Sequence, residues 1–364
     1  MKRRDVLIGG GALAVVAAGA TVIVGEQMGS ADDYDAAMTA TRAPLPEQAV
    51  TRDLIRYATL APNGHNAQPW LFRASQKRIE ILPDFARRTP VVDPDDHHLF
   101  VSLGCAAENL ALASAARGRP GTPIFDHAAN GLIAFDFAAG RADASALFDA
   151  IPKRQSTRAD YDGRPVAASD LKTLAAAAAV PGVELILITD RPQIDRVRDL
   201  IVSGNDTQMA DAAFMRELKS WLRFNPRQAA EIGDGLYSAA SGSPTLPSWL
   251  GPRALDLFLT AKSESEKYAR QMQSSSGIAV FVGAKEDRKH WTLVGRACQR
   301  FSLQATALGL KNAFVNQPVE VPALRPELAD LVGLPGRRPD IVMRFGHGTS
   351  LPFSARLPAR IVTT

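Results

Sequence analysis

The chain has 364 residues, of which 46% are hydrophobic and 22% are charged, and its formal net charge is +4. A chain of this length can bury a large core and hold two domains of ordinary size. It has no basic stripe and no interleaving of basic with aromatic residues, which argues against a nucleic-acid partner, and its six His and two Cys show no clustered ligand spacing, which predicts no metal site.

The first 30 residues have the pattern of an export signal. Lys2-Arg3-Arg4 is a charged start, and Gly9 to Gly25 is a moderately apolar stretch rich in Gly and Ala. The pattern fits a twin-arginine signal, which predicts that the twin-arginine export machinery carries the folded protein to the periplasm or beyond. Anchoring in the membrane by an uncleaved signal stays an alternative, because no single cleavage site stands out.

Residues 31–150 form the first predicted half. After a polar arm that reaches to about Leu45, the residue patterns predict a helix over 50–60, a hairpin over 71–83, a helix over 103–118 and a strand over 132–137. Between the first helix and the hairpin lies the sequence APNGHNAQPW, from Ala61 to Trp70. Pro62 and Gly64 end the helix and Pro69 restarts an extended chain, so the residues between them form a constrained polar loop.

Residues 151–364 form the second predicted half. Its patterns predict a strand over 183–189, a helix from 193, a strand over 278–282, a helix over 294–309 and a strand over 341–345. The segment 205–275 has no counterpart in the first half, and long insertions of this kind are often lids over active sites. Together the two halves predict an α+β protein with helices packed on a mixed or antiparallel sheet.

The predicted helices 103–118 and 294–309 read as two copies of one repeat. Gly104 matches Gly295 and Gly118 matches Gly309, at the same spacing of 191 residues. A constant offset indicates duplication, although alanine-rich helices also align by chance. Cys105 and Cys298 lie in the two copies, where two buried free thiols are expected, and a disulfide formed after export is the alternative.

Two stretches, one in each half, resemble the FMN-dependent nitroreductase family. RQSTR, from Arg154 to Arg158, resembles the family's R-x-S-x-R phosphate clamp, and APNGHNAQPW resembles its A-P-S-S-x-N-x-Q-P-W loop, with Asn63-Gly64 in place of the serines. In that family a two-fold dimer binds each flavin between the clamp of one subunit and the loop of the other. The resemblance therefore implies a nitroreductase-like α/β/α sandwich of two fused, pseudo-two-fold-related halves, as in the single-chain Acg-like branch.

The resemblance implies which residues hold the phosphate of FMN. Arg154 and Arg158 would bind the dianion through charge-assisted hydrogen bonds, and Ser156 would donate to it. Gln155 lies within this clamp. In the tail, Ser354-Ala355-Arg356 resembles the basic segment that completes the phosphate site, so Arg356 joins the predicted set.

The resemblance also implies which residues face the rest of the flavin. Asn66 and Gln68 would offer donors and acceptors to the ribityl chain and the ring, beside Pro62 and Asn63. His65 would contact the flavin or the substrate, donate a proton, or cap the loop. Further along, Asn316 and Gln317 would lie near the reacting edge of the ring.

The second site that a two-fold arrangement would contain is predicted to be empty. When the clamp is aligned with the first half, Arg42 matches Arg158, but Met38 stands where Arg154 would be. The loop has no counterpart in the second half, where only AVPGV, ending at Val183, is present. This interpretation predicts that Arg158→Ala lowers FMN affinity and that Arg42→Ala leaves it unchanged.

The resemblance implies an FMN-dependent oxidoreductase that reduces a small electrophile such as a nitro compound or a quinone. Flavin storage without turnover is the alternative, and a flavin-free scaffold is a third interpretation. The sequence leaves open the catalytic residues, the electron donor, the substrate and the oligomeric state, for which a pseudo-dimeric single chain makes a monomer one of the options.

Overall fold

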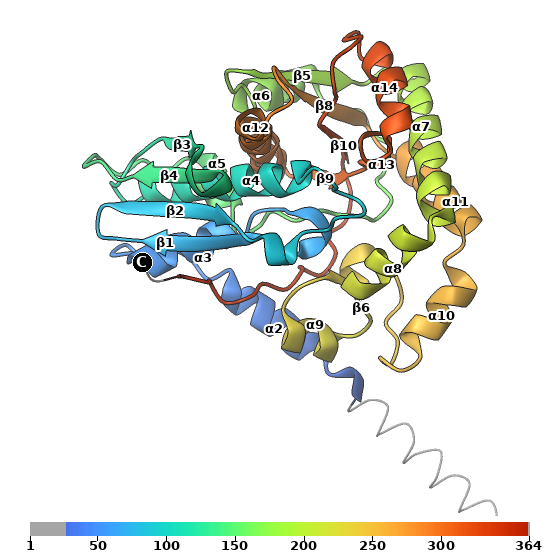
Figure 1. Cartoon of the computed structure of the whole chain (residues 1–364), viewed down its shortest axis with the longest axis horizontal. Coiled ribbons are helices and arrows are strands. Elements are labelled where there is room, and N and C mark those ends of the chain that lie inside the picture. Colours follow the sequence, from blue (N-terminus) through green and yellow to red (C-terminus); the bar gives the residue numbers. More distant parts are fainter. Residues whose placement is uncertain (1–26, 363–364) are drawn as a thin grey trace, which may run out of the picture.

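The computed structural model describes residues 27–362, so the charged start and the apolar stretch of the predicted signal lie outside the described residues. The described chain forms two four-stranded antiparallel sheets and two long helices that pack on each other in the middle of the molecule (Figure 1). The predicted α+β class with helices on an antiparallel sheet is confirmed. None of the described helices combines the length and the apolar character needed to span a membrane.

The two sheets share one topology. The first sheet has the order β1 (Trp70–Ala74), β2 (Arg78–Pro83), β4 (Leu132–Asp136), β3 (Pro123–Asp126). The second has the order β5 (Val183–Ile188), β8 (Gly277–Gly283), β10 (Ile341–Gly346), β9 (Lys311–Phe314). In both sheets the strands that come first, second, fourth and third along the chain lie side by side in that order. A long helix connects the second and third strands of each sheet, which is what a duplicated unit would produce.

These two connecting helices are α4 (His97–Ala115) and α12 (Arg288–Ala307), the two copies of the repeat. They cross closely because glycines lie at the contact: a Cβ atom at Gly104 would be 2.1 Å from the Thr292 carbonyl oxygen, and one at Gly295 would be 2.0 Å from a carbonyl oxygen of α4. Beside this crossing, the Sγ atoms of Cys105 and Cys298 are 3.6 Å apart, and both residues are buried free thiols. Small residues therefore set how closely the two halves approach.

The remaining helices cover the sheets and build the insertion. The segment expected as a polar arm is instead largely helical, because Ser30 caps a helix that buries Tyr34 and Met38. The insertion 205–275 contains the end of α7, then α8 to α11, with a two-stranded parallel pair, β6 (Leu222–Arg223) and β7 (Leu236–Tyr237). The helices are α2 (Ala31–Thr41), α3 (Thr51–Thr59), α5 (Ala146–Ala150), α6 (Ala168–Ala177), α7 (Arg191–Ala210), α8 (Ala212–Trp221), α9 (Pro226–Ile232), α10 (Gly251–Phe258), α11 (Ala261–Gln273), α13 (Gln317–Glu320) and α14 (Arg325–Leu331).

The C-terminal segment ties the second half to the first. After β10 the chain runs past α2 and α3 and pairs with β1 in parallel, through Phe72 and Ile361 (Figure 1). The Phe72 amide donates to the Arg360 carbonyl at 2.9 Å, and the Val362 amide donates to the Phe72 carbonyl at 2.8 Å. This path carries Arg356 from the second half to the C-terminal end of α3, in the first half.

Candidate functional site

Two adjoining cavities lie where segments of both halves and the insertion meet. The larger has a volume of about 220 Å³ and the smaller about 50 Å³. Their shared wall contains Pro62 and Asn63 from the loop, Arg158 from the clamp, Leu236 from the insertion, and Phe314 at the end of β9. Both motifs that the sequence analysis singled out therefore border the same site.

The smaller cavity gathers four arginines from different parts of the chain. Arg42 ends α2, Arg154 and Arg158 follow α5, and Arg356 lies in the C-terminal segment. No Asp or Glu lines this cavity, and none of the four guanidinium groups has an ion-pair partner among residues 27–362. The cavity is thus a concentration of positive charge without a carboxylate to balance it.

Helix ends supply part of the compensation. Arg154 Nη2 donates to the Leu60 carbonyl at 3.1 Å, and Arg356 donates to the Thr59 and Ala61 carbonyls at 2.7 and 3.1 Å. These are the unpaired carbonyls at the C-terminal end of α3, where the helix dipole favours cations. Arg42 donates to the Met38 carbonyl of its own helix at 3.3 Å.

These carbonyls do not satisfy all the N–H donors of Arg154. Arg154 is 4% exposed, and its Nε and Nη1 atoms are buried without a hydrogen-bond partner in the described structure. Burial lowers the pKa of Arg42 and of Arg154 to about 10. Burial, with the charges of Arg42 and Arg154, lowers the pKa of Arg356 as well. Buried, mutually repelling cations with unused donors are the chemistry of a site that accepts an anion.

The position of Arg42 corrects the sequence interpretation. Alignment with Arg158 placed it in an empty second site, whereas the structure places it in the same cavity as the clamp. The reason is that α2 packs on α9 of the insertion, and the Arg42 guanidinium stacks on Phe353 at 4.0 Å and donates to the Ser354 carbonyl. The alignment of Arg42 with Arg158 therefore does not predict where α2 lies. The expectation that Arg42→Ala leaves FMN affinity unchanged has no structural basis, because Arg42 lines the clamp cavity.

The rest of the clamp borders the smaller cavity as expected. Ser156 lines it, and its backbone pairs with that of Asn312 in β9. Gln155 also lines it, but its side chain is engaged with the chain after β10: Nε2 donates to the Leu351 carbonyl at 2.8 Å, and Oε1 accepts from the Leu351 amide at 2.9 Å. Gln155 thus fixes the C-terminal segment against the clamp.

The polar loop has an unusual backbone that the insertion supports. His65, Asn66 and Gln68 have φ values of 48°, 54° and 55°, a region that non-glycine residues seldom occupy. The Asn66 carbonyl accepts from the Gly235 amide at 3.3 Å, and Gln68 Nε2 donates to the Gly233 carbonyl at 2.9 Å. The insertion therefore holds the loop in its shape.

Two loop residues, Gln68 and Asn66, hold neighbouring parts of the protein in place. Gln68 lies outside both cavities, 1% exposed, and its Oε1 accepts from the Leu357 amide at 2.9 Å. The structure gives it a bracing role in place of the flavin contact expected from the sequence. Asn66 does line the smaller cavity, where its Oδ1 accepts from Arg356 Nη1 at 2.8 Å and so orients that arginine.

The larger cavity combines an apolar wall with amides and charges. Residues 205–275, the insertion predicted from the sequence, supply much of its lining. The lining residues from this segment are Asn205, Gln208, Met209, Phe214, Leu218, Leu236, Leu259, Glu264 and Tyr268. Asn316 and Gln317 also line it, and Gln317 Oε1 is buried without a partner in the described structure. The two residues expected near a reacting ring therefore border the larger cavity, while the arginines gather at the smaller.

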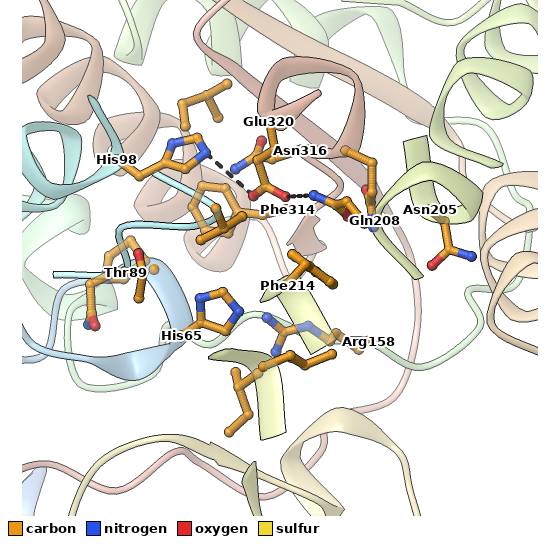
Figure 2. Close-up of a pocket in the computed structure, with 18 of the residues that line it drawn as sticks. His65, Thr89, His98, Arg158, Asn205, Gln208, Phe214, Phe314, Asn316 and Glu320 are labelled. Carbon is orange, nitrogen blue, oxygen red and sulfur yellow. Dashed lines mark hydrogen bonds and ion pairs between the residues drawn. The ribbon is translucent and has the colours of Figure 1, made fainter. Parts of the chain in front are cut away.

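Three polar side chains in this cavity were missed by the sequence analysis. His98 Nε2 and Glu320 Oε1 are 3.4 Å apart, and Gln208 Nε2 donates to Glu320 Oε2 at 2.7 Å. Figure 2 shows these three in a row on one side of the cavity, with His65 and Arg158 on the other. The adjacent histidines His97 and His98, at the start of α4, are the sequence signal that could have drawn attention to this wall. Among residues 27–362, no group of His, Cys, Asp and Glu is arranged to hold a metal ion.

The two histidines of the cavity have opposite charge preferences. Burial lowers the pKa of His65 to about 4, so it is neutral near pH 7. Burial also disfavours the charged form of His98, but Glu320 and Asp93 outweigh it and raise its pKa. The pKa of Glu320 is lowered because its hydrogen bond and ion pair with His98 outweigh burial. The pKa shifts of His98 and Glu320 therefore both favour the charged forms of this pair.

Comparison with known proteins places this site in context. No protein-family model matches the chain. The chain is 27% identical over 311 residues to a protein of Mycobacterium tuberculosis (strain ATCC 25618 / H37Rv) named "Putative NAD(P)H nitroreductase Rv3131", and the match covers 83% of this chain and 86% of that protein. It is 26% identical over 246 residues to "Uncharacterized protein MT1398" of the same species, covering 65% of this chain and 32% of that protein.

Solved structures also align with parts of the chain. A nitroreductase with bound FMN from Desulfitobacterium hafniense aligns with a TM-score of 0.40 and 16% identity, over 60% of this chain and 98% of that one. The FMN-dependent nitroreductase NfnB from Mycobacterium smegmatis, in complex with NADPH, aligns with a TM-score of 0.37 and 11% identity, over 56% and 87% of the two chains. The sequence similarity to the protein named as a putative NAD(P)H nitroreductase, over most of both chains, supports the nitroreductase resemblance that the two motifs carry.

Proposed function

We propose that this protein is an FMN-dependent oxidoreductase of the nitroreductase type, which reduces a small electrophilic molecule. The observation that carries the proposal is the cluster of four arginines without a carboxylate at one end of a divided cavity. A phosphate dianion supplies the charge and the acceptors that this cluster lacks. FMN joins such a dianion to a flat ring, and the cavity has a polar, basic part beside a larger, more apolar part.

The residues present fit this cofactor. Arg42, Arg154 and Arg356, with Ser156, would hold the phosphate in the smaller cavity. Arg158 borders both cavities, so it would lie between the phosphate and the ring. The ring would occupy the larger cavity against Phe314 and the apolar residues of the insertion, close to the amides of Asn63, Asn316 and Gln317.

A bound flavin would supply electron transfer, and the protein would supply binding, orientation and a shielded cavity. The arginines would fix the phosphate end, while the braced loop, with its positive-φ residues, would present a rigid wall. Cys105 lines the larger cavity, but its thiol is buried and its pKa is raised, so we assign it no chemical step. The mycobacterial relative is named for NAD(P)H, and we propose a reduced nicotinamide as the electron donor to test first.

Three further assignments extend this proposal. We assign the chain to the single-chain Acg-like branch, with two halves that meet near residue 151 and one flavin per chain. Residues 205–275 would act as a lid, since they supply much of the cavity wall. The twin-arginine pattern at Lys2-Arg3-Arg4 supports export of the folded, loaded protein to the periplasm, with retention by an uncleaved signal as the alternative. Fusion of residues 1–30 to a reporter that is active only after export tests this last assignment.

The visible absorption spectrum of the purified protein is the first experiment. A flavin band, with released cofactor identified as FMN at about one per chain, is expected. Riboflavin, which lacks the phosphate, is the matched control ligand and should bind far more weakly than FMN. A colourless protein that takes up neither added FMN nor riboflavin would refute the proposal, and equal affinity for both would refute the role of the arginine cluster.

A further inference from the structure

The pair of His98 and Glu320 lies apart from the arginine cluster. It lies in the larger cavity, opposite His65 and Arg158, whereas Arg42, Arg154 and Arg356 line only the smaller cavity (Figure 2). The side chains of His98 and Glu320 are only 12% and 18% exposed. Charges held this far from bulk water carry a desolvation cost, which a protein sustains where the charge has a use.

The geometry leaves the imidazole of His98 available to a ligand. Nε2 is 3.4 Å from Glu320 Oε1, a looser contact than a strong hydrogen bond, so a substrate oxygen can compete for it. Nδ1 is buried without a hydrogen-bond partner among residues 27–362 and does not face the ligand. Glu320 is held more firmly, by Gln208 Nε2 at 2.7 Å. The carboxylate is therefore the fixed member of the pair, and the imidazole is the member free to exchange its partner.

We propose that His98 is the proton donor to the substrate, and that Glu320 is a positioning residue that keeps His98 protonated. The proposal rests on the proposed function. Reduction of a carbonyl or nitroso oxygen by two electrons needs a hydride equivalent and a proton. Reduced flavin supplies the hydride equivalent, and the proton passes from His98 Nε2 to the substrate oxygen as negative charge develops there. His98 is left neutral and regains its proton from solvent, so electrons and protons balance.

The neighbours of His98 support this assignment over one to His65. His65 is neutral near pH 7, because burial lowers its pKa to about 4, so it lacks the acidic proton of an imidazolium. The cationic form of His98 is disfavoured by burial and by Arg338, and it is favoured by the two carboxylates Glu320 and Asp93. The groups that face it are Glu320 on α13, Asp93 before α4, His97 on α4, His65 in the loop and Arg338 before β10.

The test uses the FMN-loaded protein, reduced in advance with dithionite and mixed anaerobically with 1,4-benzoquinone, so that the electron donor is not involved. His98→Gln keeps a polar side chain without a proton to transfer, and it should slow flavin reoxidation by about 100-fold or more. His127→Gln is the matched control, since His127 is exposed and lines neither cavity, and it should react like the wild type.

Glu320→Gln separates positioning from mere support of the fold. In the wild type the reoxidation rate should fall as pH rises through the pKa of His98, which lies above its usual 6.5. Without the carboxylate this pKa falls, so the same decline should begin at lower pH. The titration of the His98 imidazole, followed by NMR of ¹⁵N-histidine-labelled protein and assigned by its loss in His98→Gln, should move to lower pH by the same amount.

The outcomes separate this proposal from the function on which it rests. FMN affinity of both variants, measured by fluorescence, should remain within about threefold of the wild type, and a protein that never binds FMN would sink the proposed function instead. Wild-type reoxidation rates in His98→Gln, or an NMR shift in Glu320→Gln without a matching shift of the rate profile, would overturn the proton-donor role.

Discussion

Replacement of Arg154 by Met should affect affinity and stability in opposite directions. Arg154 is 4% exposed, and two of its three guanidinium nitrogens, Nε and Nη1, have no partner in the described structure. Its third nitrogen donates to the Leu60 carbonyl, which also accepts from Arg356 Nη2 at 3.3 Å. Met keeps much of the side-chain volume while it removes the charge and the unused donors. The folded protein without ligand therefore loses little.

The sizes of the expected changes in stability and in FMN affinity follow from the two Arg154 nitrogens that have no partner. A buried donor without a partner costs about 1–3 kcal/mol, so the ligand-free variant should be between equally stable and about 3 kcal/mol more stable than the wild type. Removal of the charge also relieves Arg42 and Arg356, whose pKa values Arg154 lowers. Two lost charge-assisted bonds to a phosphate are worth about 1.5–3 kcal/mol each, which lowers FMN affinity by about 100-fold or more.

The assay compares two ligands and two variants. FMN and riboflavin are titrated by flavin fluorescence, and urea unfolding of the ligand-free protein gives the free energy of unfolding. Riboflavin affinity should change by less than about twofold, because riboflavin has no phosphate. Arg52→Met is the control, since Arg52 is exposed on α3 outside both cavities, and it should change neither quantity. A variant that is less stable and binds both ligands equally weakly would show that Arg154 supports the fold, and would refute the anion site.

Three further predictions test other parts of the structure. Arg42→Ala should lower FMN affinity by about 10-fold or more in the same titration, because Arg42 lines the phosphate cavity, and an unchanged affinity would restore the second-site interpretation. Gly104→Ala should lower the free energy of unfolding by about 1–3 kcal/mol, because its methyl group would overlap a carbonyl of α12, whereas Gly64→Ala, with open space around it, should change it little. Maleimide should leave Cys105 and Cys298 unlabelled until the protein is unfolded, because both thiols are buried, and rapid labelling of the native protein would contradict the tight helix crossing.

Local patterns predicted the frame of the molecule well. The repeat helices contain runs of small and apolar residues, and in the structure they cover His97–Ala115 and Arg288–Ala307, so they begin six residues before the predicted positions and end two or three residues before them. The hairpin and the strands β4, β5, β8 and β10 begin and end within two residues of the predicted positions. These elements carry their signal in residues that are close together in the chain, so periodicity and turn residues suffice to find them. The helix α2 was missed because its polar composition hides the few residues that it buries.

The site was harder to predict because its contacts join distant segments. His98 and Glu320 are 222 residues apart and meet because α13 lies over the start of α4, a packing that no local pattern encodes. The sequence analysis placed Arg42 in a second site by aligning it with Arg158, but α2 brings Arg42 to the same cavity as Arg158. The motif residues fared better, since Asn63, His65, Ser156 and Arg158 all line the two cavities. Gln68 shows the limit of a motif: its amide holds the loop in shape without lining a cavity.

The two halves differ in the segments that wall the two cavities. In the first half, residues 60–69 connect α3 to β1 and form the loop that walls both cavities. In the second half, residues 178–182 connect α6 to β5, which is too short to form such a wall. The insertion exists in the second half alone, and it braces the loop of the first half through Gly233 and Gly235. The loop and its support therefore belong to one side of the two-fold-like arrangement of the sheets. The fused duplication that we propose would permit this difference, because its halves can change independently, whereas a substitution in a homodimer appears at both sites.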